Sequence, residues 1–210
     1  MERQITLGAI QTVAHYILPS LITRCREIYP NLQINTYEGF LGALVNGIVE
    51  GHIDLAIVSV PLADSRLSVE TTFREPLMLA VGRNHPLASK RTFTVADLSE
   101  ETFIMMGRSS TLTEQVQQFG GEHHFEPRIA YRCGQVETLK SLVGLGLGIA
   151  ILPRLSQAPN DHATIVYRQL TDRTPTREIG IVRHLQRYQN RGTAQFLELI
   201  CQIFRSFGDK

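Results

Sequence analysis

The fold is most strongly constrained by short apolar runs that alternate with segments of helical periodicity. Residues 128–132 form a strand-like run, and the apolar positions that follow recur at helical spacing: Val136, Leu139, Leu142 and Val143. Gly144 or Gly146 can adopt the left-handed conformation that closes a helix, and the apolar run 149–152 then ends at Pro153. This stretch predicts a βαβ unit, whose helix begins at the carboxyl edge of the sheet.

The first half of the chain repeats this pattern. We expect a strand over residues 5–10, a polar loop at Gln11 and Thr12, and a helix that begins just before Pro19, because proline is tolerated only in a first turn. That helix should end near Tyr29. A strand over 32–37, a helix over 41–49 closed by Gly51, and a buried strand over 53–60 complete a βαβαβ set, which is typical of a parallel sheet.

A second βαβαβ set is expected over about residues 77–152. Its predicted parts are strands at 77–81 and 103–106, a short capped helix at 94–98, and a helix that begins at a capping box from Thr111 to Glu114 and ends at Phe119, before Gly120 and Gly121. Residues 156–163 are interpreted as a loop. The tail predicts strands at 165–167 and 179–182, then a helix with one apolar face formed by Ala194, Leu197, Ile200, Cys201 and Phe204.

Composition excludes several classes of protein. The 210 residues carry a net charge of +1, which is not the basic balance of a domain that grips DNA by itself. The nearest basic cluster is Arg183, Arg187 and Arg191, which we interpret as a solvated face. No run of 18 apolar residues exists, and the first residues do not resemble a signal peptide. Three widely spaced cysteines without a CxxC motif indicate reduced thiols in a cytoplasmic protein.

Four motifs in this order resemble the effector-binding domain of LysR-type transcriptional regulators: "LGAIQTVAHYILPSLITRCREIYPNLQINTYEG", "GHIDLAIV", "EPLMLAVGRNHPLA" and "VETLKSLVGLGLGIAILP". The resemblance covers essentially the whole chain. It implies a type 2 periplasmic-binding-protein-like α/β fold, in which two Rossmann-like subdomains are joined by two crossover connections around a central cleft. Subdomain I would hold residues 1–74 and 177–210, and subdomain II residues 75–176.

The resemblance also implies partners. The family's N-terminal winged helix-turn-helix has no counterpart in this chain, so DNA would be bound only through that missing part. We expect a homodimer, with a tetramer for the full-length protein, and no cofactor, metal site or membrane contact. The dimer would pair subdomain I of one chain with subdomain II of the other, and Tyr16 and Ile17 are the apolar residues expected to add to the contact made by the helix from residue 18 to 29.

Within the family, two stretches look most like the peroxide-sensing branch: "GAIQTVAHYILP" and "FREPLMLAVGRNHPLA". That branch needs a reactive cysteine where this chain has Thr111, and a resolving cysteine near Gly120. Because neither is cysteine, a dithiol peroxide switch is excluded. Reversible binding of a small, anionic metabolite remains the expectation.

The expected effector site lies where helices begin after strands, since free backbone N–H groups there bind anions. Its predicted residues are Thr12, Val13, His15, Leu41, Gly42, Arg108, Ser109, Ser110, Gln135 and Val136. Simple helix capping is the alternative for the serines and threonines, and favoured for Thr111 with Glu114. His15 can equally be a neutral structural histidine, and Arg108 a surface residue. Cys25 and Cys201 are expected in the core, whereas Cys133 lies near the cleft and is the one cysteine to test for reactivity.

Two other functions use the same fold. A periplasmic solute-binding protein is the first alternative, and the absent signal peptide counts against it. An enzyme is the second, although the sequence has neither a GxxxxGK[S/T] phosphate loop nor a convincing nucleophile–base set. We therefore expect a ligand-sensing, dimerising regulatory domain without catalytic residues.

Overall fold

The computed structural model describes residues 3–208. The chain divides into two compact units, Met1–Glu75 with Glu178–Lys210, and Pro76–Arg177. Two strands, β4 (Leu67–Gly82) and β9 (Thr176–His184), carry the chain from one unit to the other. Each unit is described by itself below.

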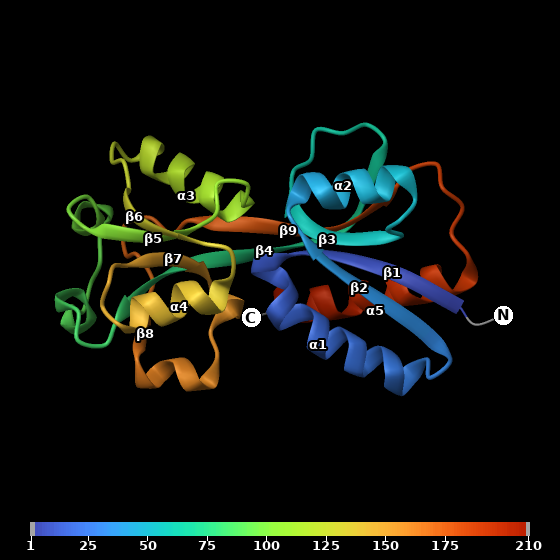
Figure 1. Ribbon diagram of the computed structural model, residues 1–210, viewed down its shortest axis with the longest axis horizontal. Coiled ribbons are helices and arrows are strands. Elements are labelled where there is room, and N and C mark those ends of the chain that lie inside the picture. Colours follow the sequence, from blue (N-terminus) through green and yellow to red (C-terminus); the bar gives the residue numbers. More distant parts are fainter. Residues whose placement is uncertain (1–2, 209–210) are drawn as a thin grey trace. The chain divides into compact units, whose positions relative to one another are not determined.

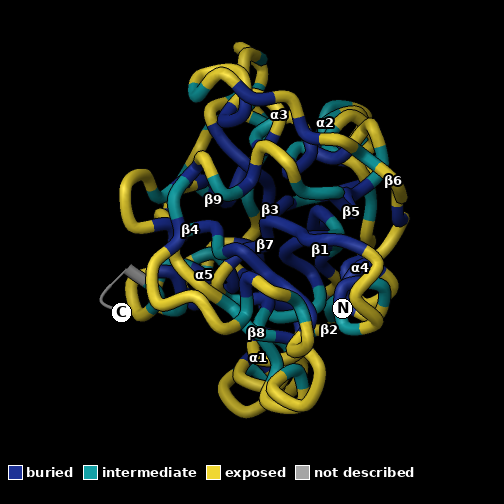
Figure 2. The backbone as a smooth tube through the Cα atoms, turned by 90° about the vertical axis from the view of Figure 1, so that its left-hand side faces the viewer, coloured by how far each residue is buried: buried dark blue, intermediate teal, exposed yellow. Residues whose placement is uncertain are grey.

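The first unit is built on the parallel sheet that the sequence predicts. Its elements are β1 (Arg3–Ile10), α1 (Gln11–Ile28), β2 (Leu32–Gly39), α2 (Leu41–Glu50), β3 (Leu55–Val60) and α5 (Arg191–Gly208). Strand β1 pairs in parallel with β2 and with β3, and β9 pairs antiparallel with β3. Helices α1 and α5 cover one face of these strands and α2 covers the other (Figure 1). Strand β3 is buried throughout, as its continuous apolar run requires (Figure 2).

The predicted start of α1 is wrong. Gln11 and Thr12, which were expected to form a loop, are the first two residues of α1, and the helix continues without a break through Pro19. A proline inside a helix removes one backbone hydrogen bond and costs about 3 kcal/mol. Pro19 is exposed, however, while the opposite face buries Val13, Ile17, Leu21 and their neighbours. Burial of one such side chain contributes about 1.5–3 kcal/mol, so several together outweigh the proline.

The tail of the chain corrects two further predictions. Ala194 is exposed, and the buried face of α5 is formed by Phe196, Leu199, Ile200 and Phe204. The arginines at 183, 187 and 191 do not share a helix. Arg183 lies on β9 with its Nε 2.6 Å from a Glu70 carboxylate oxygen, and Arg187 donates to carbonyls of α2. These two arginines are therefore structural and do not form a solvated basic face.

The second unit contains a shorter parallel set than predicted. Its other elements are β5 (Thr102–Met106), α3 (Thr111–Glu122), β6 (Arg128–Cys133), α4 (Val136–Gly144), β7 (Ala150–Pro153) and β8 (Ile165–Arg168). Strands β5 and β6 are parallel, and Phe103 forms a parallel bridge with Ile149 just before β7. Strand β4 instead runs antiparallel to β7 and β8. The βαβαβ set therefore begins at β5, and residues 77–81 do not belong to it.

Local capping differs from the prediction at α3. Ser110 is the N-cap residue and Thr111 is already helical, so the predicted capping box is wrong; Gly120 and Gly121 lie inside the helix. At the second predicted cap the expectation is confirmed: Thr94 and Asp97 form a capping box at a 3-10 helix over Val95–Leu98. The segment 156–163 is not simply a loop, because Pro159–Ala163 forms another 3-10 helix.

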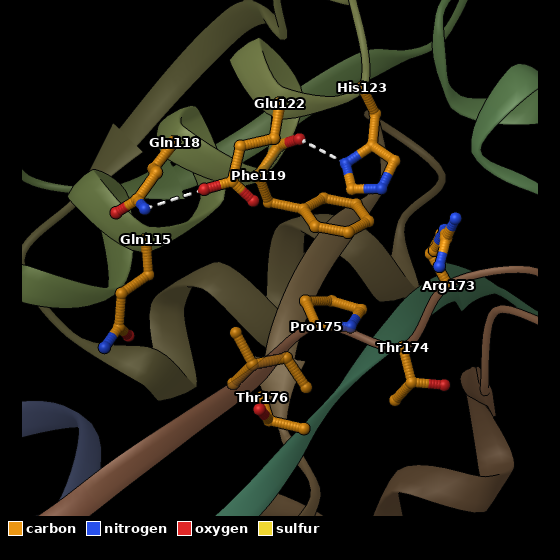
Figure 3. A pocket seen from close by; sticks show the side chains of 10 residues that line it. Gln115, Gln118, Phe119, Glu122, His123, Arg173, Thr174, Pro175 and Thr176 are labelled. Carbon is orange, nitrogen blue, oxygen red and sulfur yellow. Dashed lines mark hydrogen bonds between the residues drawn. The ribbon is translucent and has the colours of Figure 1, made fainter.

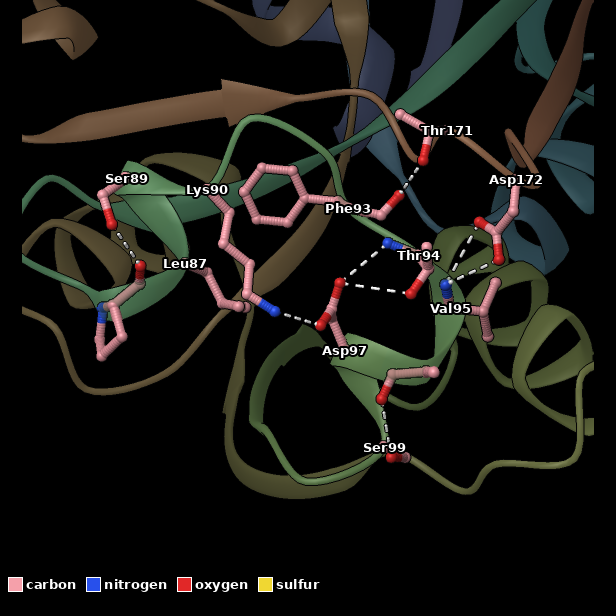
Figure 4. A network of polar contacts seen from close by, with 12 residues as sticks. Leu87, Ser89, Lys90, Phe93, Thr94, Val95, Asp97, Ser99, Thr171 and Asp172 are labelled. Carbon is pink, nitrogen blue, oxygen red and sulfur yellow. Dashed lines mark hydrogen bonds and ion pairs between the residues drawn. The ribbon is translucent and has the colours of Figure 1, made fainter.

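A polar network fixes the irregular segment around this capping box (Figure 4). The Asp97 carboxylate accepts from the Thr94 backbone N–H at 3.0 Å and lies 2.5 Å from Lys90 Nζ. Asp172 accepts from the Val95 N–H at 3.2 Å, and the Thr171 hydroxyl donates to the Phe93 carbonyl at 2.8 Å. Loop segments far apart in sequence are thereby held together, over the core of the second unit.

Candidate functional site

Two helices begin at the same sheet edge in the first unit. Ile10, the last residue of β1, pairs in register with Gly39, the last residue of β2. The next elements, α1 at Gln11 and α2 at Leu41, therefore start side by side. Neither N-cap residue, Ile10 or Phe40, caps its helix with a side chain. First-turn N–H groups without a side-chain cap are suited to an anion.

The second unit repeats this arrangement. Met106, at the end of β5, pairs in register with Cys133, at the end of β6, and the Gly107 N–H donates to the Cys133 carbonyl at 2.9 Å. Helix α3 follows β5 and α4 follows β6, so both helices open at one edge. Their N-cap residues, Ser110 and Gln135, make no side-chain cap bond. Each unit thus presents a pair of helix N-termini.

The predicted site residues fall into two groups, one in each unit. Those of the first unit are Thr12, Val13 and His15 on α1 with Leu41 and Gly42 on α2, and those of the second unit are Arg108, Ser109 and Ser110 before α3 with Gln135 and Val136 at α4. The side chains of Val13 and Val136 are buried in the core, so only their backbone could contact a ligand. Arg108, Ser109 and Gln135 are exposed, as a contact with a ligand would require.

His15 lies within the first turns of α1. Its Nδ1 is 3.4 Å from the Gln11 carbonyl oxygen, and its ring meets the Tyr16 ring edge-on at a centroid distance of 5.1 Å. Tyr16 in turn donates to Glu75 at 2.9 Å. Sequence reasoning missed this role of Tyr16, which it assigned to a dimer contact. The only local signal was the spacing of Tyr16, one helical turn after Thr12.

The cysteines of the chain are poorly placed for chemistry. Burial raises the pKa of the Cys133 thiol and that of the Cys25 thiol. Because the thiolate is the nucleophile, a raised pKa lowers reactivity near neutral pH. Cys133 is 6% exposed and therefore packs as a small apolar side chain at the end of β6. Cys201 is half-buried and is not the full core residue that was predicted.

A separate pocket of about 300 Å³ lies in the second unit, between α3 and residues 173–176 (Figure 3). Gln118 Nε2 donates to Glu122 at 2.8 Å, and His123 Nδ1 lies 2.9 Å from the Phe119 carbonyl oxygen. The pocket is lined by the later turns of α3, and none of the ten predicted site residues lines it. It is therefore distinct from the helix N-termini described above.

No group of three or more His, Cys, Asp or Glu side chains within residues 3–208 is arranged to hold a metal ion. Within the same range, no helix has the length and apolar character needed to cross a membrane.

Comparison with known proteins identifies the class. Residues 1–204 match the family described as LysR substrate binding domain, so the chain belongs to that family. The resemblance and the fold expected from the sequence are both confirmed. The chain is 29% identical, over 184 residues, to the DNA-binding transcriptional dual regulator OxyR of Escherichia coli K12, covering 87% of this chain and 60% of that protein. It thus spans about 60% of the length of this curated relative.

Two solved structures have the same fold. The effector binding domain of QuiR in complex with shikimate superposes with a TM-score of 0.86 at 18% identity, covering 98% of this chain and 99% of that chain. The Synechocystis PCC6803 CcmR regulatory domain in complex with 2-PG superposes with a TM-score of 0.86 at 23% identity, covering 96% of this chain and 97% of the other. At these identities the likeness establishes the fold.

Proposed function

We propose that this chain is the effector-sensing domain of a transcription regulator and binds a small anionic metabolite at the paired helix N-termini. The observation that carries the proposal is the repeated edge: in each unit, two helices without side-chain caps begin next to one another after parallel strands. Thr12 lies in the first turn of α1 and Ser110 is the N-cap residue of α3, and both are largely buried. The position of the effector between the subdomains stays a prediction of the sequence.

The chemistry of this edge favours an oxyanion. Backbone N–H groups and hydroxyls donate hydrogen bonds, and the helix dipole adds positive potential. Each charge-assisted bond contributes about 1.5–3 kcal/mol, so a few of them support binding in the micromolar range after association costs. Shikimate, the ligand in the QuiR structure, is a small carboxylate. Leu41 offers no hydroxyl at the start of α2, so we expect the part of the ligand that faces Leu41 to be less polar than the rest.

A thermal-shift screen followed by calorimetry tests the proposal. Shikimate, 2-PG and a set of small mono- and dicarboxylates are the probes, and we expect at least one to raise the melting temperature. The combination of Thr12→Val with Ser109→Ala should weaken binding of that probe at least about tenfold, equivalent to 1.4 kcal/mol. Ser109 is chosen because it is exposed, so its loss should leave folding intact.

The matched control carries the same chemical changes away from the helix starts. Thr23→Val lies on the exposed side of α1 near its far end, and Ser141→Ala lies on the exposed side of α4. This control should bind the probe as the wild type does. A wild-type protein that responds to no probe, or a site variant that binds with unchanged affinity, would contradict the proposal.

The relatives favour this function over the alternatives. The curated relatives OxyR of Escherichia coli and GltC of Bacillus subtilis are both described as transcriptional dual regulators. DNA binding by the whole protein, through a domain outside this sequence, is part of the same proposal. We also propose that the domain pairs with a second copy of itself.

Self-association is supported by edge strands with exposed apolar side chains. Strand β2 is at the edge of its sheet and carries Tyr37, which is 49% exposed. Strand β6 carries Tyr131, and the turn after α4 exposes Leu145 and Leu147. Unpaired edges and exposed apolar residues are typical of interaction surfaces. The predicted contribution of Ile17 is wrong, because Ile17 is fully buried in the first unit, whereas that of the half-buried Tyr16, which donates to Glu75, stays a prediction.

A further inference from the structure

A buried tyrosine–carboxylate contact joins α1 to β4 within the first unit. The Tyr16 hydroxyl donates to Glu75 Oε2 at 2.9 Å, and Glu75 is only 1% exposed. Removing a carboxylate from water is costly unless hydrogen bonds replace the lost solvation. A hydrogen bond to an ionised acceptor is roughly twice as strong as a neutral one. The contact is therefore a strong, specific link between segments that are 59 residues apart in sequence.

Tyr16 lies near the predicted effector residues of α1, and Glu75 lies on the strand that leads out of the first unit. Tyr16 is four residues after Thr12, so both side chains lie on the same side of α1. Its ring also contacts the ring of His15, another predicted effector residue. Glu75 is the last residue of the N-terminal segment of the first unit, on the strand that continues directly into the second unit. One end therefore lies at the candidate effector site and the other at a crossover strand.

We propose that Tyr16 is a positioning residue that couples the first turns of α1 to the crossover strand β4 through Glu75. An effector that contacts Thr12 or His15 then changes the constraint on β4 at the residue where the chain leaves the first unit. This inference rests on the proposed function, since it assigns a route by which effector binding at that same site is transmitted.

The coupling is measured without any ligand, by hydrogen exchange of backbone amides. Tyr16→Phe removes only the hydroxyl, and it should speed exchange of residues 15–18 and 72–75 about tenfold. His15→Gln removes the ring contact to Tyr16. It should speed exchange at residues 72–75 about threefold, which corresponds to the lower end of the energy range of an edge-on aromatic contact. In the Tyr16→Phe background, His15→Gln should have no further effect on residues 72–75, because the link is already broken.

A second tyrosine supplies the matched control. The Tyr167 hydroxyl donates to the Asp161 carboxylate at 2.7 Å in the second unit, so Tyr167→Phe deletes the same kind of bond far from α1 in sequence. It should leave exchange at residues 15–18 and 72–75 unchanged. Equal acceleration at residues 72–75 in this control would mean global destabilisation and would overturn the proposal. A His15→Gln effect that persists in the Tyr16→Phe background would overturn it too.

The outcome is separable from that of the proposed function. Failure of effector sensing appears as a wild-type protein that binds no probe, whereas failure of the coupling appears in the exchange cycle of ligand-free protein. Where shikimate or 2-PG does bind, Tyr16→Phe should weaken its affinity about threefold or more while Tyr167→Phe does not. Equal affinities in wild type and Tyr16→Phe would count against the coupling.

Discussion

Asp161 shows how one carboxylate can hold together several elements of the second unit. Its Oδ2 is 3.0 Å from Lys140 Nζ on α4, and it accepts from the Tyr167 hydroxyl on β8 and from the Ala158 N–H. Burial raises the pKa of Asp161, but these hydrogen bonds and the Lys140 charge together hold that pKa below its usual value. Burial and the neighbouring Asp161 carboxylate raise the pKa of Tyr167, which therefore stays a donor.

We expect Asp161→Asn to destabilise the protein by about 3 kcal/mol at pH 7, because the buried Lys140 ammonium loses the Asp161 charge and keeps the exposed Glu137 carboxylate at 3.4 Å. A carboxyl whose pKa is lowered by folding contributes stability above its unfolded-state pKa of about 3.9, and that contribution is lost as pH falls through the folded value. The difference from wild type should therefore shrink below about pH 4. Urea unfolding at pH 7 and at pH 3 measures it.

Asp64→Asn is the control for this effect. Hydrogen bonds from Arg66 lower the pKa of Asp64 to about 2, but the pair is on the surface, where solvent screens it. The variant should unfold as the wild type does at pH 7. A loss of stability as large as that of Asp161→Asn would show that burial is not the deciding factor.

At the scale of elements, α3 contains two adjacent glycines with opposite roles. A Cβ on Gly120 would lie 2.6 Å from the Phe125 carbonyl oxygen, whereas a Cβ on Gly121 would meet nothing within 4 Å. Gly121→Ala should stabilise the protein by about 0.5–1 kcal/mol, since alanine lowers the entropy cost of a helix. Gly120→Ala should destabilise it, because backbone must move. Thermal unfolding measures the change in stability of each variant relative to wild type. Equal changes in the two variants would contradict this packing.

Helix α2 is capped by a residue far away in the sequence. Arg187 donates to the Ile48 carbonyl at 2.8 Å and to the Val49 carbonyl at 3.2 Å, at the end of a helix with no basic residue in its last turn. Arg187→Ala should lower the free energy of unfolding in urea by about 1–2 kcal/mol, since it removes two charge-assisted hydrogen bonds that the guanidinium donates to helix carbonyls. Arg191→Ala, which changes an exposed arginine at the start of α5, should have little effect. Equal losses in the two variants would contradict a specific cap.

For the whole molecule, the testable property is pairing with a second copy. We expect light scattering to give a dimer at concentrations on the order of tens of micromolar. Leu145→Lys, at a side chain that is 74% exposed after α4, should weaken the dimer at least about tenfold, because a charge replaces an apolar contact. Leu185→Lys, at a residue 50% exposed on another loop, is the control and should pair normally. A monomeric wild type would contradict the expectation.

Much of the fold could be predicted because its signals are local. Periodicity places β1, α2, β3, α4 and the C-terminal end of α1, and Gly51 closes α2 in the left-handed conformation with φ of 90°. The order of four motifs was enough to indicate the family, which the match over residues 1–204 confirms. The candidate site residues were predicted from helix starts after strands, and their part in effector binding remains a prediction.

Interactions between distant segments were decided only in the tertiary structure. Pro19 argued locally for a later start of α1, but burial of the opposite face carries the helix from Gln11. Arg187 looked solvated until α2 supplied its acceptors, and Tyr16 looked like surplus apolar surface until Glu75 accepted its hydrogen bond. Helical periodicity and turn residues act over a few positions and can be read from the chain alone. The hydrogen-bond partners of Tyr16 and Arg187 lie 59 and 139 residues away in the sequence, so only folding determines them.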